Sequence, residues 1–71
     1  MTTLIESPIA GLVAAVETTQ GAPVARGDTL IIVESMKMEI PVESEVQGQV
    51  LRLLVAVGEQ VAEGQAIAEI G

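Results

Sequence analysis

The sequence predicts an all-β fold, a small sandwich or flattened barrel built from two similar halves. Short apolar segments rich in Val and Ile are separated by glycine and proline, which leaves little room for a helix of ordinary length. A pattern of glycines and valines occurs twice along the 71 residues. Because Cys, His and aromatic residues are absent, Val, Ile, Leu, Ala and Met must form the core. We expect one domain, residues 1–71, near the size where a single core becomes marginal.

The strands expected along the chain are short. Residues 30–33 are apolar and largely β-branched, as strands are, and residues 46–53 partly alternate between apolar and polar side chains. Residues 55–68 could also form a helix, but two glycines interrupt that segment. Residues 67–70 again read as a strand. We expect turns at those glycines where a positive φ is needed.

Two half-repeats, residues 9–34 and 46–71, account for this layout. Glycine and valine are common residues, but a whole glycine triad and apolar positions at one fixed offset argue against coincidence. Neither half could bury its apolar face alone, so pairing them about an approximate two-fold axis gives one shared core. The positions that recur 37 residues later are Gly11, Gly21, Gly27, Val13 and Val24, which become Gly48, Gly58, Gly64, Val50 and Val61.

A hairpin joins the halves, with its tip at residues 35–38. If Met36 and Lys37 form a two-residue loop, strand alternation places apolar side chains on the core face and glutamates on the other face. Met38 then falls on the core side, while Met36 is free at the tip. The expected pairs are Ser35 with Met38, Glu34 with Glu39, Val33 with Ile40 and Ile31 with Val42.

The tip of this hairpin breaks a local rule. Two-residue loops favour turns with positive φ, where Gly or Asn is expected, and here Met36 and Lys37 hold those places. Strain at an exposed tip indicates function. Lys37 is the only lysine in the chain, and its neighbours Glu34 and Glu39 do not provide the burial or the cation that a Schiff-base lysine needs. What remains is an exposed primary amine that another enzyme could acylate.

The composition excludes several classes of function. A net charge of −7 repels phosphate backbones, and no aromatic ring can stack on a base, so we expect no nucleic-acid partner. The acidity fits either solubility or steering toward basic surfaces of partner enzymes. Without a basic leader or a long apolar run, we expect no membrane span and a cytoplasmic location. Because His, Cys and Tyr are absent, we expect no catalytic residues, no metal site and no enzyme by itself.

The run Glu-Ser-Met-Lys-Met-Glu-Ile-Pro at residues 34–41 lies midway between the half-repeats. In that setting it resembles the biotinyl/lipoyl attachment domain family, and within it the biotin carboxyl carrier branch, which typically reads Glu-Ala-Met-Lys-Met. The resemblance covers residues from about 7 to 70. It implies two antiparallel four-stranded sheets related by pseudo-two-fold symmetry, with the modified lysine on a tight hairpin turn.

The resemblance also implies roles for single residues. Lys37 matches the lysine to which biotin protein ligase attaches biotin, and Met36 and Met38 match the flanking methionines of the biotin branch. Glu34 falls where many lipoyl domains carry a glutamate, so it does not discriminate between the two cofactors. The full set expected to be recognised by the ligase is Glu34, Ser35, Met36, Met38 and Glu39.

Three residues depart from the usual family pattern. Ser35 replaces an alanine, and Ala10 and Glu45 stand where many members have a proline. The chain also lacks the extra loop of the bacterial acetyl-CoA carboxylase carrier subunit. In these respects it resembles small stand-alone biotin/lipoyl attachment proteins.

The function implied is a non-catalytic carrier. Biotin on Lys37 would take a carboxyl group from a biotin carboxylase to a carboxyltransferase. One alternative is a lipoyl carrier domain of a multienzyme complex, although lipoyl domains usually read Asp-Lys-Ala at the site. Another is an unmodified β interaction module, such as the related hairpin domains of efflux adaptor proteins, which lack a lysine at the turn.

Overall fold

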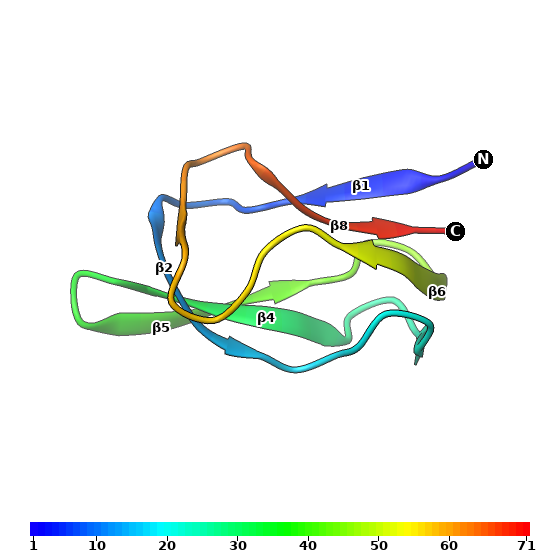
Figure 1. The fold of residues 1–71 in the computed structure, drawn as a ribbon, viewed down its shortest axis with the longest axis horizontal. Coiled ribbons are helices and arrows are strands. Elements are labelled where there is room, and N and C mark those ends of the chain that lie inside the picture. The colour runs from blue at the N-terminus through cyan, green and yellow to red at the C-terminus, as the bar shows by residue number, and fades with distance from the viewer.

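The computed structural model describes all 71 residues and contains eight strands and no helix. The strands are β1 (Thr3–Glu6), β2 (Gly11–Val16), β3 (Pro23–Val24), β4 (Thr29–Ser35), β5 (Met38–Glu43), β6 (Gly48–Leu53), β7 (Gln60–Val61) and β8 (Ala66–Ile70). They form two four-stranded antiparallel sheets, in the orders β1-β8-β6-β3 and β5-β4-β2-β7 (Figure 1). The predicted fold class is confirmed, and the segment with a helical alternative contains β7 and the start of β8. No helix is therefore present that could cross a membrane.

One apolar cluster fills the space between the two sheets. It contains 13 buried side chains, all Val, Ile, Leu or Ala, and Val13, Val33 and Ile67 are among those with no exposed surface. Each buried Val, Ile or Leu side chain contributes about 1.5–3 kcal/mol when it leaves water. The core is thus made of aliphatic side chains alone, and it fixes the root of the hairpin.

Hydrogen bonds at the turns repeat at the offset of 37 residues. The backbone N–H of Gly27 donates to the carbonyl of Ser44 at 2.8 Å, and that of Gly64 donates to the carbonyl of Ser7 at 2.8 Å. Both serines are buried, and each hydroxyl donates to a carbonyl two residues ahead, at 2.6 Å for Ser7 and 2.5 Å for Ser44. The two halves therefore close on each other through matched polar contacts as well as through the core.

The glycines of the repeat serve two different purposes. Gly21, Gly27 and their two counterparts have φ between 83° and 93°, as expected for turn glycines. Gly11 and Gly48 do not, because they are the first residues of β2 and β6, and Gly48 lies within the segment 46–53 that was expected to form a strand. A Cβ at Gly11 would lie 2.5 Å from the carbonyl oxygen of Glu34, and one at Gly48 would lie 2.7 Å from that of Gly71. These two glycines allow close approach of strands.

The domain is elongated, with extents of 33 × 18 × 18 Å. Figure 1 shows the turn between β4 and β5 at one end of the long axis and both termini at the other end. Because β1 pairs with β8, the N- and C-terminal strands lie side by side there. The hairpin turn is therefore as far from the chain ends as the fold allows.

Candidate functional site

The β4–β5 hairpin has the register that strand alternation predicts. Ser35 pairs with Met38, Glu34 with Glu39 and Val33 with Ile40, so the loop contains two residues. Val33 is fully buried, and the glutamates on the opposite face are exposed. The alternation thus anchors the root of the hairpin in the core while its end extends into solvent.

The turn itself has an unfavourable backbone for its residues. Met36 has φ 51° and Lys37 has φ 65°, and they are the only non-glycine residues with positive φ in the chain. Positive φ at both central positions is the requirement of a type I′ turn. An L-residue with a side chain costs roughly 1–2 kcal/mol in this conformation. The conflict predicted for the tip is therefore present in the structure.

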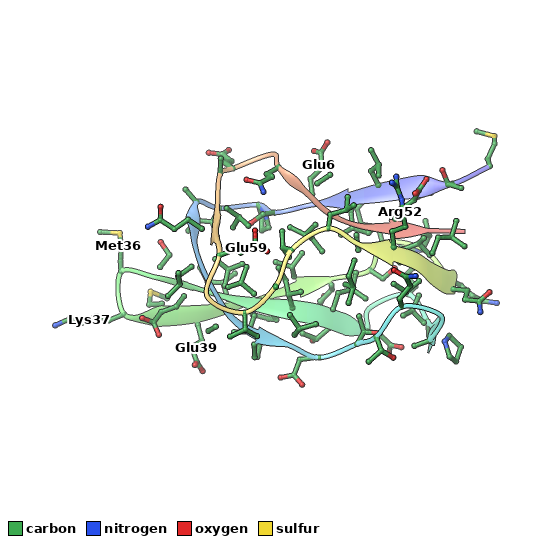
Figure 2. All side chains as sticks on the ribbon, viewed as in Figure 1. Glu6, Met36, Lys37, Glu39, Arg52 and Glu59 are labelled. Atoms are coloured by element: carbon green, nitrogen blue, oxygen red, sulfur yellow. The ribbon has the colours of Figure 1, made fainter.

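Lys37 is presented outward from this turn. Its side chain is exposed and projects beyond the ribbon at the end of the long axis (Figure 2). It takes no part in an ion pair, because the single ion pair of the chain joins Arg52 Nε to Glu69 Oε1 at 2.8 Å. A free amine at an exposed turn is suited to acylation, because an approaching enzyme can reach it without displacing any part of the domain.

The two methionines beside the lysine are both exposed. Met36 is 92% exposed, and Met38, predicted to face the core, is 63% exposed. Met38 lies on the same face as Ile40 and Val42, as the register predicts, but its side chain is not buried because this part of the hairpin extends past the end of the core. Exposure falls along β5 from Met38 through half-buried Ile40 to buried Val42. Both thioethers are therefore available to a binding partner.

The other sequence-predicted recognition residues surround the base of the turn. Glu34 and Glu39 face each other across the hairpin, and both are exposed. Like charges directly opposite one another are mildly destabilising, so this pair adds nothing to the fold. Ser35 is half-buried at the last paired position of β4. All five residues thus lie on one short segment around Lys37.

Sequence reasoning missed two neighbours of this segment. Gly11 lies against the carbonyl of Glu34, and Leu12 pairs with Glu34 across β2 and β4. Gly11 could have been identified because it belongs to the repeated glycine triad. Leu12 could have been identified because the equivalent position in the other half-repeat holds Gln49, a polar residue. Both residues bring β2 against the root of the turn.

The ion pair between Arg52 and Glu69 lies away from the turn. The pKa of the Glu69 carboxyl is lowered from its ordinary value by a hydrogen bond from the Thr2 side chain and then by Arg52. Arg52 and Glu69 face each other on β6 and β8, in the sheet that does not contain the hairpin. Lys37 is therefore the only basic side chain on the hairpin.

Known proteins match the chain over nearly its whole length. The sequence model of the family described as "Biotin-requiring enzyme" matches residues 1–70. A "Biotinylated protein TB7.3 homolog" from Mycobacterium leprae is 39% identical over 66 residues, which are 93% of each chain. A "Biotin-dependent acyl-coenzyme A carboxylase alpha3 subunit" from the same organism is 35% identical over 66 residues, 93% of this chain but 11% of that one.

A solved structure gives the same result. The crystal structure of Kluyveromyces lactis urea carboxylase superposes with a TM-score of 0.95 at 31% identity, and the match covers 100% of this chain and 6% of that one. The chain thus spans nearly all of one small relative and only a minor part of the long carboxylase chains.

Proposed function

The chain belongs to the family of biotin-requiring enzymes as a biotin carrier domain, and from this premise we propose that Lys37 is the residue that carries the biotin. The observation that supports the assignment is the exposed amine on a turn whose two residues both have positive φ. Lys37 is the only lysine, so no other side chain offers a primary amine.

The residues around the turn fit a covalently attached group. The Nζ of Lys37 is free of ion pairs, and no part of the fold has to open for an amide bond to form there. Acylation removes the positive charge of Lys37, so the net charge changes from −7 to −8. Biotin, once attached, supplies a ureido nitrogen that can accept and release a carboxyl group.

This chain's own contribution is tethering, and the domain is non-catalytic in the proposal. The strained turn fixes where the arm begins, and the lysine stem leaves its end mobile. A tethered group reaches an effective concentration of order mM at a nearby site. The proposed partners are a biotin protein ligase, which loads Lys37, and a biotin carboxylase and a carboxyltransferase, between which the carboxyl group is carried.

The test is modification of the purified chain in parallel by a biotin ligase and a lipoate ligase. Intact mass should show one added biotinyl group, and peptide mapping should place it on Lys37. Acceptance of lipoate in preference to biotin, or biotin at any other residue, would refute the assignment.

A double variant tests whether the flanking methionines set the choice of cofactor. Replacing them, Met36→Asp with Met38→Ala, should lower the rate of biotinylation and raise that of lipoylation, because both exposed thioethers lie beside the amine. The melting temperature should change little, since neither side chain is in the core. Equal rates for parent and variant with both ligases would show that recognition depends on other features of the hairpin.

A further inference from the structure

The two ends of the domain allow an internal comparison, because equivalent backbone positions lie 37 residues apart. Near the turn, the positions before and after Gly11 hold Ala10 and Leu12, and the equivalent positions around Gly48 hold Gln47 and Gln49. The amide of Gln49 donates to the carbonyl of Gly21 at 2.8 Å. Leu12, 40% exposed, has no such bond to make. The end that bears the lysine is thus apolar where its counterpart is polar.

These apolar residues line a shallow hollow beside the turn. It lies at the start of β2, which runs between the end of β4 and β7, and it is bordered by the turn. Met36, the residue that precedes Lys37, forms part of its wall. The hollow is lined in particular by Ala10, Leu12, Val61, Met36, Glu34 and Gln60.

We propose that the biotin ring system on Lys37 folds back into this hollow when the arm is not engaged by a partner. The inference rests on the proposed function, because it requires biotin on Lys37. The apolar edges of the fused rings would lie against Ala10 and Leu12. The ureido group has two N–H donors and one carbonyl acceptor, and the rim offers the Glu34 carboxylate as acceptor and the Gln60 amide as donor. Neither of these side chains makes a hydrogen bond within the domain.

A shallow site is enough for this purpose because the ligand is tethered. The arm begins one residue from Met36, so its effective concentration at the hollow is of order mM and weak contacts are populated. Weak contacts also release easily, so a partner enzyme can take the ring. The carboxylate of Glu34 makes the rim suit an uncharged ring better than an anionic one.

The experiment compares two-dimensional NMR spectra of the unmodified and biotinylated chain. An activated ester of biotin can load Lys37 without a ligase, and because the only other amine is that of the N-terminus, the product labelled at Lys37 alone can be purified and identified by peptide mapping. We expect shift changes at Ala10, Leu12, Gln60 and Val61, with nuclear Overhauser contacts from biotin ring protons to the Ala10 and Leu12 methyl groups. Shift changes confined to residues 35–39 would overturn the proposal.

Matched variants exchange the residues of the two ends. Leu12→Gln installs the residue found at the equivalent position and should abolish most of the shift changes in the hollow. Gln49→Leu makes the reverse change at the far end and should leave them intact. Loss in both variants, or in neither, would contradict the proposal. Failure of the ligase to load Lys37 would count against the proposed function alone, since the chemically loaded chain still tests the hollow.

Discussion

The chain contains two kinds of turn. Both have residues with positive φ, but these residues are glycines in one kind and residues with long side chains in the other. At Gly21, Gly27, Gly58 and Gly64 a positive φ is met by glycine, and nothing lies within 4 Å of the position that a Cβ would take. At the hairpin tip a positive φ is met by Met36 and Lys37. The glycine turns have no side chains to present, whereas the tip keeps two side chains at the cost of strain.

This contrast separates residues that stabilise the fold from residues that are available to a partner. A turn glycine avoids strain in the folded backbone, and its N–H donates a backbone hydrogen bond to a carbonyl elsewhere in the fold. Met36 and Lys37 at the tip instead add strain to the folded backbone, and neither of their side chains is buried. Substitutions at the two kinds of turn should therefore affect stability and modification independently.

The largest effect expected is at the tip. Lys37→Arg should abolish biotinylation, as measured by intact mass, while the free energy of unfolding changes within about 0.5 kcal/mol because the side chain is exposed. Adding Arg52→Lys returns a lysine within β6 of the other sheet, away from any hairpin tip, and modification should not return. Biotin on that transplanted lysine would show that the ligase does not require the tip.

The second largest effect is expected for substitution of Gly11, which packs against the root of the hairpin at Glu34. Gly11→Ala should lower the free energy of unfolding by about 1–3 kcal/mol, because its Cβ meets the backbone of Glu34. It should also slow biotinylation, since Glu34 belongs to the hairpin. Urea unfolding and ligase rates measure the two effects.

Gly48→Ala is the matched control, because its Cβ would meet Gly71 at the other end of the domain. It should lose a comparable amount of stability and keep the parent rate of modification. Equal slowing of the ligase in both variants would mean that rate follows stability rather than hairpin geometry.

A smaller effect is expected at the turn glycines. Gly27→Ala and Gly64→Ala should each lower the free energy of unfolding by about 1–2 kcal/mol, because alanine is strained at positive φ although space is available. The two losses should be similar, and the folded fraction should be biotinylated at the parent rate. Unchanged melting temperatures would show that the strain is relieved by a local shift of the backbone.

The smallest effect expected is a gain in stability. Met36→Asn should raise the free energy of unfolding by about 0.5 kcal/mol, because asparagine tolerates the left-handed conformation better than methionine. Biotinylation should become slower, since an exposed thioether is lost beside the amine. A variant that is both more stable and modified as fast as the parent would show that Met36 has no role in recognition.

Much of this arrangement could be predicted from the sequence because it depends on local periodicity. The alternation of Val33 and Glu34 fixed the hairpin register, and the absence of glycine at Met36 and Lys37 identified the strained turn. The exposure of Met38 could not be predicted in this way. Alternation tells which face a side chain takes, but only the length of the opposing sheet tells whether anything lies there.

The roles of Gly11 and Gly48 were hidden for a similar reason. A repeated glycine indicates that a side chain is excluded, but it does not say whether the backbone angle or a neighbour excludes it. At these two positions the neighbour is a carbonyl from a distant part of the chain, the one of Glu34 or of Gly71. Such long-range contacts depend on how the sheets pack.

The β4–β5 turn and the two termini lie at opposite ends of the long axis, so a rotation of the whole domain about its termini moves the turn over a long distance. Rotation about a joint near the termini displaces the backbone of Lys37 by the rotation angle multiplied by nearly the full 33 Å of the long axis. The same rotation about a joint beside the turn would hardly move it. In a longer assembly, modest swings of the whole domain would therefore add their reach to that of the flexible arm.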